Sequence, residues 1–199
     1  MLKSELRKIY LAKRKALSND ERANTARQIS ERFFAHFDLS RIKYLHIFLA
    51  IARHNEVETS FIVKRLWLDY PHIKTCVPCV DEEKNTLETV EYTKDSIIKL
   101  SRWGIPEVVR GKTVEATKID AVIAPLVCFD LQCNRVGYGK GFYDRFLQNC
   151  RPDCLKIGLS FFPPVEKIDD VNEFDVELDY CVTPEKVYSV AKAQREKSF

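Results

Sequence analysis

The sequence predicts a mixed α/β sandwich, because apolar strand-like segments alternate with helical patterns along the chain. Residues 42–51 and 73–80 have the composition of strands, and the helical stretch 58–70 lies between them. With 199 residues and 45% hydrophobic content, the chain is the size of one compact domain whose core needs neither disulfides nor a structural metal. We therefore expect a single domain over residues 1–199.

The first 37 residues predict two helices. Leu2, Leu6 and Ile9 recur at helical spacing, and residues 18–21 (Ser-Asn-Asp-Glu) form a capping box that begins the second helix. At the other end, residues 190–199 are polar and are expected to fray.

Further strands are predicted after the first strand-helix-strand unit. Residues 87–93 alternate like a half-exposed strand, and residues 120–129 are apolar enough for a central strand. Residues 155–161 and 180–183 complete the set, and a helical pattern precedes the first of these two.

The cysteines indicate a reducing compartment. Their number, seven, is odd, and Cys128 and Cys181 lie in apolar stretches where a thiol behaves as a small hydrophobic group. The only pairs with metal-like spacing are Cys76 with Cys79 and Cys150 with Cys154. Because no histidine stands at ligand spacing, no zinc site is predicted. No apolar run approaches the ~20 residues of a membrane span, so a cytoplasmic protein is expected.

The charge balance argues against a polyanion-binding protein. A net charge of +3 from 32 basic and 29 acidic side chains gives a weak overall field, so any anionic ligand must be bound locally. A nucleic-acid-binding module that uses the basic first helices is disfavoured for the same reason.

Residues 134–147, NRVGYGKGFYDRFL, carry the strongest functional signal. Gly137, Gly139 and Gly141 are three of only six glycines, and they stand between an apolar strand and a helical pattern. Such a loop can turn its amides toward a phosphate at the start of the helix. The alternative is a plain tight turn.

This loop matches neither common nucleotide motif. Lys140 is followed by glycine instead of serine or threonine, and Phe142 stands where the dinucleotide fingerprint requires a glycine. Arg135 and Lys140 would add positive charge, and Asp144 could hold a magnesium ion or simply begin the helix.

The same stretch resembles the signature of the 5-formyltetrahydrofolate cyclo-ligase family, also called 5,10-methenyltetrahydrofolate synthetases. Four further segments resemble that family in order: KSELR (3–7), FLAIARHNEVET (48–59), WGIPE (103–107) and FDVELDYCVTPEKVY (174–188). The resemblance implies a three-layer α/β/α fold with a mixed, mainly parallel sheet. It also implies an ATP- and magnesium-dependent closure of 5-formyltetrahydrofolate to 5,10-methenyltetrahydrofolate, in which ATP phosphorylates the formyl oxygen, and a monomer without nucleic-acid or membrane partners.

The resemblance assigns the ATP site to two segments, one at each end of a long stretch of chain. Its residues are Lys3, Ser4, Glu5, Leu6 and Arg7, together with Arg135, Val136, Gly137, Tyr138, Gly139, Lys140, Gly141, Phe142 and Tyr143. Lys140 and Arg135 are expected to be catalytic. From spacing alone, Lys3 and Arg7 share a helix face with Tyr10 and Arg14, a basic stripe that would reach a phosphate or remain an ordinary solvated face.

The expected folate contacts are Leu49, Glu56, Trp103 and residues 138–142 (Tyr138, Gly139, Lys140, Gly141 and Phe142). A carboxylate such as Glu56 can accept two hydrogen bonds from the amino-pyrimidine edge of a pterin. Without the resemblance, Glu56 would rather be interpreted as a favourable acid at a helix N-terminus. Trp103 could stack on a flat ring, with a core position as the equal alternative.

Asp144 and Asp175 correspond to the magnesium positions, although Asp175 alone would read as part of a solvated acidic loop. Two departures affect detail: Phe142 replaces a common tyrosine, and Phe174 stands where bacterial members often carry histidine. A second enzyme class, a sugar-phosphate isomerase or CoA-transferase on a similar scaffold, would need no ATP.

Overall fold

The structure, a computed structural model, describes residues 1–81, 86–101 and 104–190. Its centre is an eight-stranded sheet in the order β12-β11-β10-β7-β1-β2-β3-β6. The strands are β1 (Tyr44–Ile47), β2 (Lys74–Asp81), β3 (Thr86–Glu91), β6 (Thr113–Val114), β7 (Ala121–Ala124), β10 (Leu155–Leu159), β11 (Tyr180–Val182) and β12 (Val187–Ser189). Strands β11, β10, β7, β1 and β2 are parallel, whereas β12, β3 and β6 pair antiparallel at the edges.

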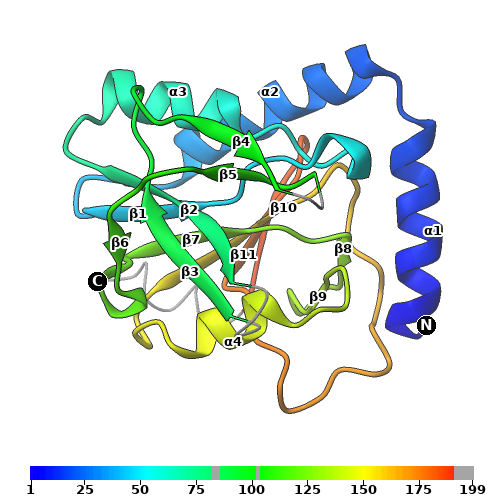
Figure 1. Ribbon diagram of the computed structural model, residues 1–199. Coiled ribbons are helices and arrows are strands. Elements are labelled where there is room, and N and C mark those ends of the chain that lie inside the picture. Colours follow the sequence, from blue (N-terminus) through cyan, green and yellow to red (C-terminus); the bar gives the residue numbers. More distant parts are fainter. Residues whose placement is uncertain (82–85, 102–103, 191–199) are drawn as a thin grey trace.

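Helices cover both faces of this sheet (Figure 1). The helices are α1 (Lys3–Ala16), α2 (Asn19–His36), α3 (Ser60–Asp69) and α4 (Phe142–Gln148), with short 3-10 turns η1 (Ala52–His54) and η2 (Ala116–Lys118). Helices α2 and α3 lie over one face and α4 over the other, while α1 stands at the side. The expected three-layer α/β/α fold with a mainly parallel sheet is confirmed.

Two small sheets accompany the main one. They are the hairpin of β4 (Ile98–Leu100) and β5 (Pro106–Val108) and the hairpin of β8 (Cys128–Phe129) and β9 (Arg135–Val136). The sequence predicted one strand over residues 120–129, whereas the structure has β7 and β8. Pro125 separates them, and because proline has no backbone N–H it cannot continue a central ladder.

Neighbouring residues of β1 face opposite layers. Leu45 and Ile47 belong to the apolar cluster beneath α2 and α3. His46 is on the other face, where its ring centroid lies 4.7 Å from that of Phe146 in α4. The two layers are therefore built from alternate side chains of the same strand.

The predicted start of α2 is confirmed in atomic detail. The amide of Glu21 donates to Ser18 Oγ at 3.2 Å, and the amide of Ser18 donates back to Glu21 Oε2 at 2.7 Å. These are the two reciprocal bonds of a capping box.

The first predicted helix is confirmed as α1, and only one of the three residues whose spacing indicated it is buried. Leu2 and Ile9 are 46% and 38% exposed, whereas Leu6, Tyr10 and Arg14 are buried. The inward stripe of the helix therefore includes an arginine. Leu6 and Tyr10 pack with Val127 of the segment that leads into the β8-β9 hairpin.

Arg14 is the main polar contact between α1 and the body of the protein. Its side chain is 1% exposed and donates to the carbonyl of Leu126, to that of Val127 at 3.2 Å and to the hydroxyl of Tyr138 at 3.0 Å. A buried guanidinium is tolerated only with such partners. Arg14 thus fixes α1 against both the segment after β7 and the glycine-rich loop (residues 137–141, between β9 and α4).

Only the first residue of the expected frayed tail, residues 190–199, lies within the described part of the chain. Val190 is partly buried, and its amide donates to the carbonyl of Asp179 at 3.3 Å. Residues 191–199 of the expected frayed tail lie outside the described residues.

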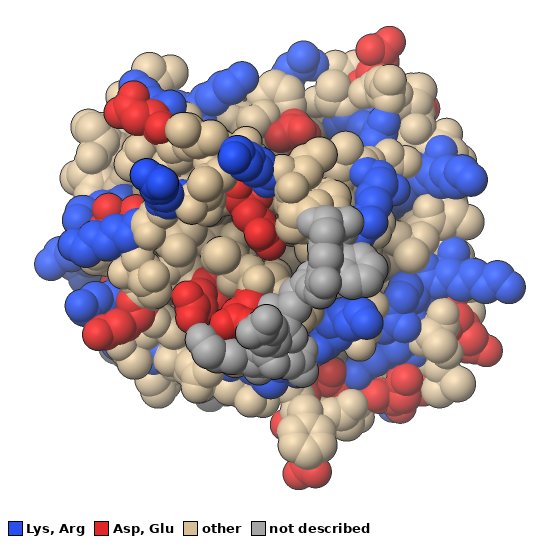
Figure 2. Space-filling view, viewed as in Figure 1, with Lys and Arg blue, Asp and Glu red and all other residues tan. Residues whose placement is uncertain are grey.

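No helix among the described residues is long and apolar enough to cross a membrane. Acidic and basic side chains are interspersed over the face drawn in Figure 2, consistent with the net charge of +3.

Replacing Arg14 should destabilise the fold. Arg14→Met keeps most of the apolar stem but leaves two carbonyls and a phenol without their charged donor, so the free energy of unfolding should fall by about 3 kcal/mol. Chemical denaturation monitored by circular dichroism measures this. Lys8→Met, an exposed position on the same helix, is the control; equal effects of the two substitutions would contradict the role of Arg14.

Candidate functional site

The glycine-rich loop connects β9 to α4. The conformation of its backbone requires glycine at two of its three glycine positions. Gly139 and Gly141 have φ angles of +91° and +67°, which side chains disfavour. A Cβ atom on Gly139 would lie 3.5 Å from an Arg7 guanidinium nitrogen, and one on Gly141 would lie 2.9 Å from Arg145 Nη1. Gly137 has no positive φ, and a Cβ atom added to it would meet no other atom within 4 Å. Two of the three glycines are therefore required by the conformation of the loop.

The basic stripe of α1 faces this loop and not the solvent. Arg7 Nε donates to the carbonyl of Gly137 at 2.8 Å, and Arg14 reaches the hydroxyl of Tyr138. Two segments some 130 positions apart are thus in direct contact. Two other residues of α1 that the resemblance assigns to the ATP site, Ser4 and Glu5, are exposed.

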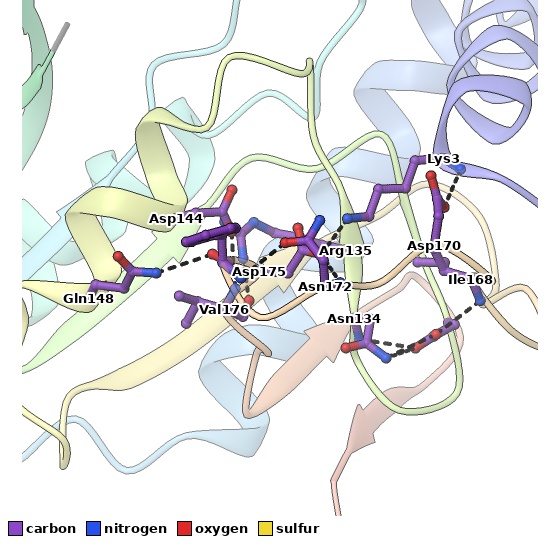
Figure 3. Close-up of polar contacts among 12 residues, drawn as sticks. Lys3, Asn134, Arg135, Asp144, Gln148, Ile168, Asp170, Asn172, Asp175 and Val176 are labelled. Atoms are coloured by element: carbon purple, nitrogen blue, oxygen red, sulfur yellow. Dashed lines mark hydrogen bonds and ion pairs between the residues drawn. The ribbon is translucent and has the colours of Figure 1, made fainter.

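Both carboxylates of the expected magnesium site are paired with cations (Figure 3). Asp144 Oδ1 accepts from Arg135 Nη2 at 2.6 Å and from the amide of Val176 at 3.1 Å. Asp175 Oδ2 accepts from Lys3 Nζ and from the amide of Asn172.

Because Val176 follows Asp175, the structure brings the two acids into one cluster. Arg135 also donates to the carbonyl of Val176 and is buried, so it links the start of α4 to the segment that holds Asp175.

Two carboxylates beside the glycine-rich loop suit a magnesium ion, which usually takes one or two protein oxygens together with phosphate and water. Both hydrogen bonds of Asp144 use Oδ1, and both of Asp175 use Oδ2. The donor chemistry therefore fits the ion. No cluster of three or more His, Cys, Asp or Glu side chains fit for a metal occurs in the described part of the chain.

Glu56 is a buried acid beside the same loop. The amide of Ile51 donates to Glu56 Oε2 at 2.7 Å, and Tyr138 forms a hydrogen bond with the Glu56 side chain. Burial raises the pKa of Glu56, and these bonds and the charge of Arg14 only partly offset it. Its alternative reading as an exposed helix-start acid is wrong, because Glu56 is 7% exposed and precedes α3 by four positions.

His54 was not predicted as part of this region. Its ring stacks on Tyr138 at a centroid distance of 4.6 Å and an interplanar angle of 25°. The sequence carried no signal for this contact, because His54 and Tyr138 are 84 positions apart.

Leu49 lines a cavity that Glu56 does not line. This cavity has a volume of about 220 Å³ and lies between the start of α3 and the β4-β5 hairpin. The cavity is lined by Leu49, Ala50, Glu58, Thr59, Ser60, Val63, Lys64, Trp67, Tyr92, Ile98 and Pro106. Glu56 is not among these described residues, so the two expected folate positions do not share this cavity.

The remaining predicted residues take different positions around the loop. Lys140 is exposed at its tip, and the half-buried Phe142 carries the Arg145 guanidinium over its ring at 5.3 Å. Tyr143 directs its hydroxyl inward to His46 Nε2 at 3.1 Å. Trp103 lies outside the described residues.

Comparison with known proteins gives a consistent result. A profile of the 5-formyltetrahydrofolate cyclo-ligase family matches residues 1–184. The chain is 29% identical over 179 residues to the 5-formyltetrahydrofolate cyclo-ligase of Mus musculus, covering 83% of this chain and 85% of the relative. It is 27% identical over 181 residues to that of Mycoplasma genitalium, covering 90% and 97%.

Solved structures agree. The chain resembles the NMR structure of Aquifex aeolicus 5,10-methenyltetrahydrofolate synthetase, with a TM-score of 0.81, 28% identity and coverage of 96% of this chain and 94% of that one. For the Mycoplasma pneumoniae 5,10-methenyltetrahydrofolate synthetase the TM-score is 0.74, the identity 27% and the coverage 92% and 99%.

The buried charge of Glu56 predicts a pH-dependent stability difference. Because the folded-state pKa is raised, the acid favours folding most when protonated and loses that contribution as pH rises through this pKa. Glu56→Gln does not titrate, so its free energy of unfolding relative to wild type should be higher at pH 7 than at pH 4.

Denaturant titrations at the two pH values give this difference. Glu88→Gln, at an exposed position of β3, should show a smaller change between them. A relative stability of Glu56→Gln that falls on going from pH 4 to pH 7 would contradict the assignment.

Proposed function

The chain belongs to the 5-formyltetrahydrofolate cyclo-ligase family, and on that premise we propose that it uses ATP to close 5-formyltetrahydrofolate to 5,10-methenyltetrahydrofolate. The carrying observation is the contact of Arg7 with the carbonyl of Gly137. It joins the two segments to which the family resemblance assigns the nucleotide. A glycine loop at a helix start, next to inward-facing cations, is a favourable environment for phosphate groups.

The proposed reaction needs ATP for a chemical reason. The formyl oxygen of the substrate is a poor leaving group, so it first attacks the γ-phosphorus and ADP leaves. N10 then attacks the formyl carbon and loses its proton, and the formyl oxygen departs as inorganic phosphate. The products are methenyltetrahydrofolate, ADP and phosphate, and every atom of the formyl group is accounted for.

Lys140 is the proposed catalytic cation. Its side chain is exposed at the tip of the loop, where it can approach the transferred phosphoryl group and stabilise negative charge developing on its oxygens. Arg7, already in contact with the loop, would hold the nucleotide phosphates from the α1 side.

The ion pairs around α4 support a second part of the proposal. Asp144 and Asp175 would hold magnesium, which when bound neutralises phosphate charge. Arg135 is buried and bonded to both Asp144 and Val176, so its proposed role is to orient the two acids. Lys3 forms an ion pair with Asp175.

Glu56 is the proposed anchor of the pterin. Tyr138 and the amide of Ile51 hold its carboxylate at the base of the loop, and Arg14 lies close enough to stabilise the negative charge. A fixed carboxylate matches the two donors on the amino-pyrimidine edge. Binding that edge would recover part of the cost of keeping the charge buried.

The direct test follows absorbance of the methenyl product in the near ultraviolet with purified protein, 5-formyltetrahydrofolate and magnesium, with and without ATP. An ATP-dependent rise is expected. A rise of equal rate without ATP would refute the phosphorylation step, and a flat trace from folded protein would refute the activity and favour another phosphate-bearing substrate.

Substitutions should separate the two proposed roles. Lys140→Ala should lower kcat by about 100-fold, because it removes a charge that acts in the transition state. Glu56→Ala should mainly raise KM for the folate by about tenfold, because it removes charged hydrogen bonds to the bound substrate. Steady-state kinetics with each substrate varied in turn measures both.

The matched control for Lys140→Ala is Lys94→Ala, at an exposed lysine distant in sequence from the loop. Its kinetic constants should equal those of wild type. An unchanged kcat in Lys140→Ala would remove that residue from the mechanism.

A further inference from the structure

A buried histidine lies directly between the sheet and the start of α4. His46 is in β1 and is 0% exposed. Its Nδ1 lies 2.7 Å from Thr89 Oγ1, and its Nε2 lies 3.1 Å from the hydroxyl of Tyr143. A neutral imidazole has one donor and one acceptor nitrogen, and each hydroxyl can play either part. Both contacts are therefore satisfied in either tautomer.

His46 has no acid-base part in this arrangement. Burial lowers the pKa of His46 to about 3, because the charged form would be desolvated. The ring consequently stays neutral over the physiological range and acts as a fixed polar support. The buried hydrogen bonds of His46 also favour one orientation of its ring, since a displaced ring would leave the hydroxyls of Thr89 and Tyr143 without these partners.

The start of α4 depends on contacts with the sheet. The helix has only seven residues, and its N-cap, Gly141, supplies no capping side chain. Such a short helix has little stability of its own. Tyr143 and Phe146 are three positions apart on one helix face, and both rings contact the His46 ring, at centroid distances of 5.7 and 4.7 Å.

Fixing Tyr143 also fixes its neighbours. Asp144 is the next residue, and its carboxylate pairs with Arg135. A rotation of the first turn of α4 would move this carboxylate and the end of the glycine-rich loop together.

Resting on the function proposed above, we infer that His46 is a positioning residue for the cyclo-ligase reaction. It holds the hydroxyl of Tyr143 and so sets the first turn of α4, with Asp144, against the sheet. Thr89 holds the other side of the imidazole and prevents the ring from turning. Misplacement of catalytic groups by even a fraction of an ångström lowers turnover, and His46 prevents it without touching the substrate.

Two conservative substitutions separate positioning from a general need for a buried polar group. In His46→Gln the amide can occupy the place of Nε2 and keep the Tyr143 contact. In His46→Asn the amide can occupy the place of Nδ1 and keep only the Thr89 contact. We expect kcat to fall by about tenfold in His46→Asn and by less than about threefold in His46→Gln.

Thermal unfolding of both variants checks that each is folded at the assay temperature. Wild-type protein in the same assay tests the proposed function separately. If wild type closes the ring and the two variants have equal kcat values, the inference is wrong while the proposed function stands; absence of ATP-dependent turnover in wild type removes both.

A double-mutant cycle tests whether His46 acts through Tyr143. The kcat of His46→Asn combined with Tyr143→Phe should equal that of Tyr143→Phe alone, because the contact is already lost. Multiplication of the two single effects would overturn the inference.

A measurement without His46 variants covers the case in which they fail to fold. In protein labelled with ¹⁵N-histidine, the His46 Nε2 resonance should shift in Tyr143→Phe relative to wild type, because the hydrogen bond to the Tyr143 hydroxyl is lost. The kcat of Tyr143→Phe should fall with it. A resonance that Tyr143→Phe leaves in place, or a kcat that it leaves unchanged, would overturn the inference.

Discussion

The buried guanidinium of Arg14 is the interaction on which the arrangement of the site depends. It joins the N-terminal helix to the carbonyls that follow β7 and to Tyr138 of the glycine-rich loop, and its charge acts on Glu56. A buried cation is costly unless all of these partners are in place, so α1, the loop and the Glu56 segment have one low-energy arrangement. Two regions more than 110 positions apart along the chain are thereby held side by side.

Most of the fold follows from local patterns in the sequence. The capping box at Ser18 predicted the start of α2, and the strand-helix-strand order from residue 42 to residue 80 predicted β1, α3 and β2. Local reasoning failed where a single residue or a distant contact decides the outcome. Pro125 divides an apolar run into two strands, and the short edge strands β6 and β12 depend on partners already in the sheet.

The sequence indicated candidate residues for the site but not the contacts between them. Glycine spacing predicted an anion-binding loop, with a tight turn as the alternative, and two of its glycines adopt conformations that side chains disfavour. The inward direction of the basic stripe was not predictable, because a solvated face is the default for exposed charges such as Lys3, Arg7 and Arg14. The contacts of His46 with Tyr143 and of His54 with Tyr138 join residues separated by more than 80 positions, and that of His46 with Thr89 spans 43. No local sequence pattern encodes such contacts.

Charge pairing gives the site its electrostatic character. Lys3 with Asp175 and Arg135 with Asp144 keep cations and carboxylates together beside the loop, and Arg7 and Arg14 add positive charge from the α1 side. In the proposed function, the metal of a magnesium-nucleotide complex would take up these carboxylates, and its phosphates would meet the cations. His46, as the proposed neutral support, would keep the start of α4 in place.

The most direct measurement is the crystal structure of the protein with magnesium and a non-hydrolysable ATP analogue. The phosphates should lie between α1 and the glycine-rich loop, within hydrogen-bonding distance of Arg7 and the loop amides, with the metal on Asp144 or Asp175. Phosphates bound elsewhere, for example at the cavity beside Leu49, would contradict the account of one site built from α1 and the glycine-rich loop.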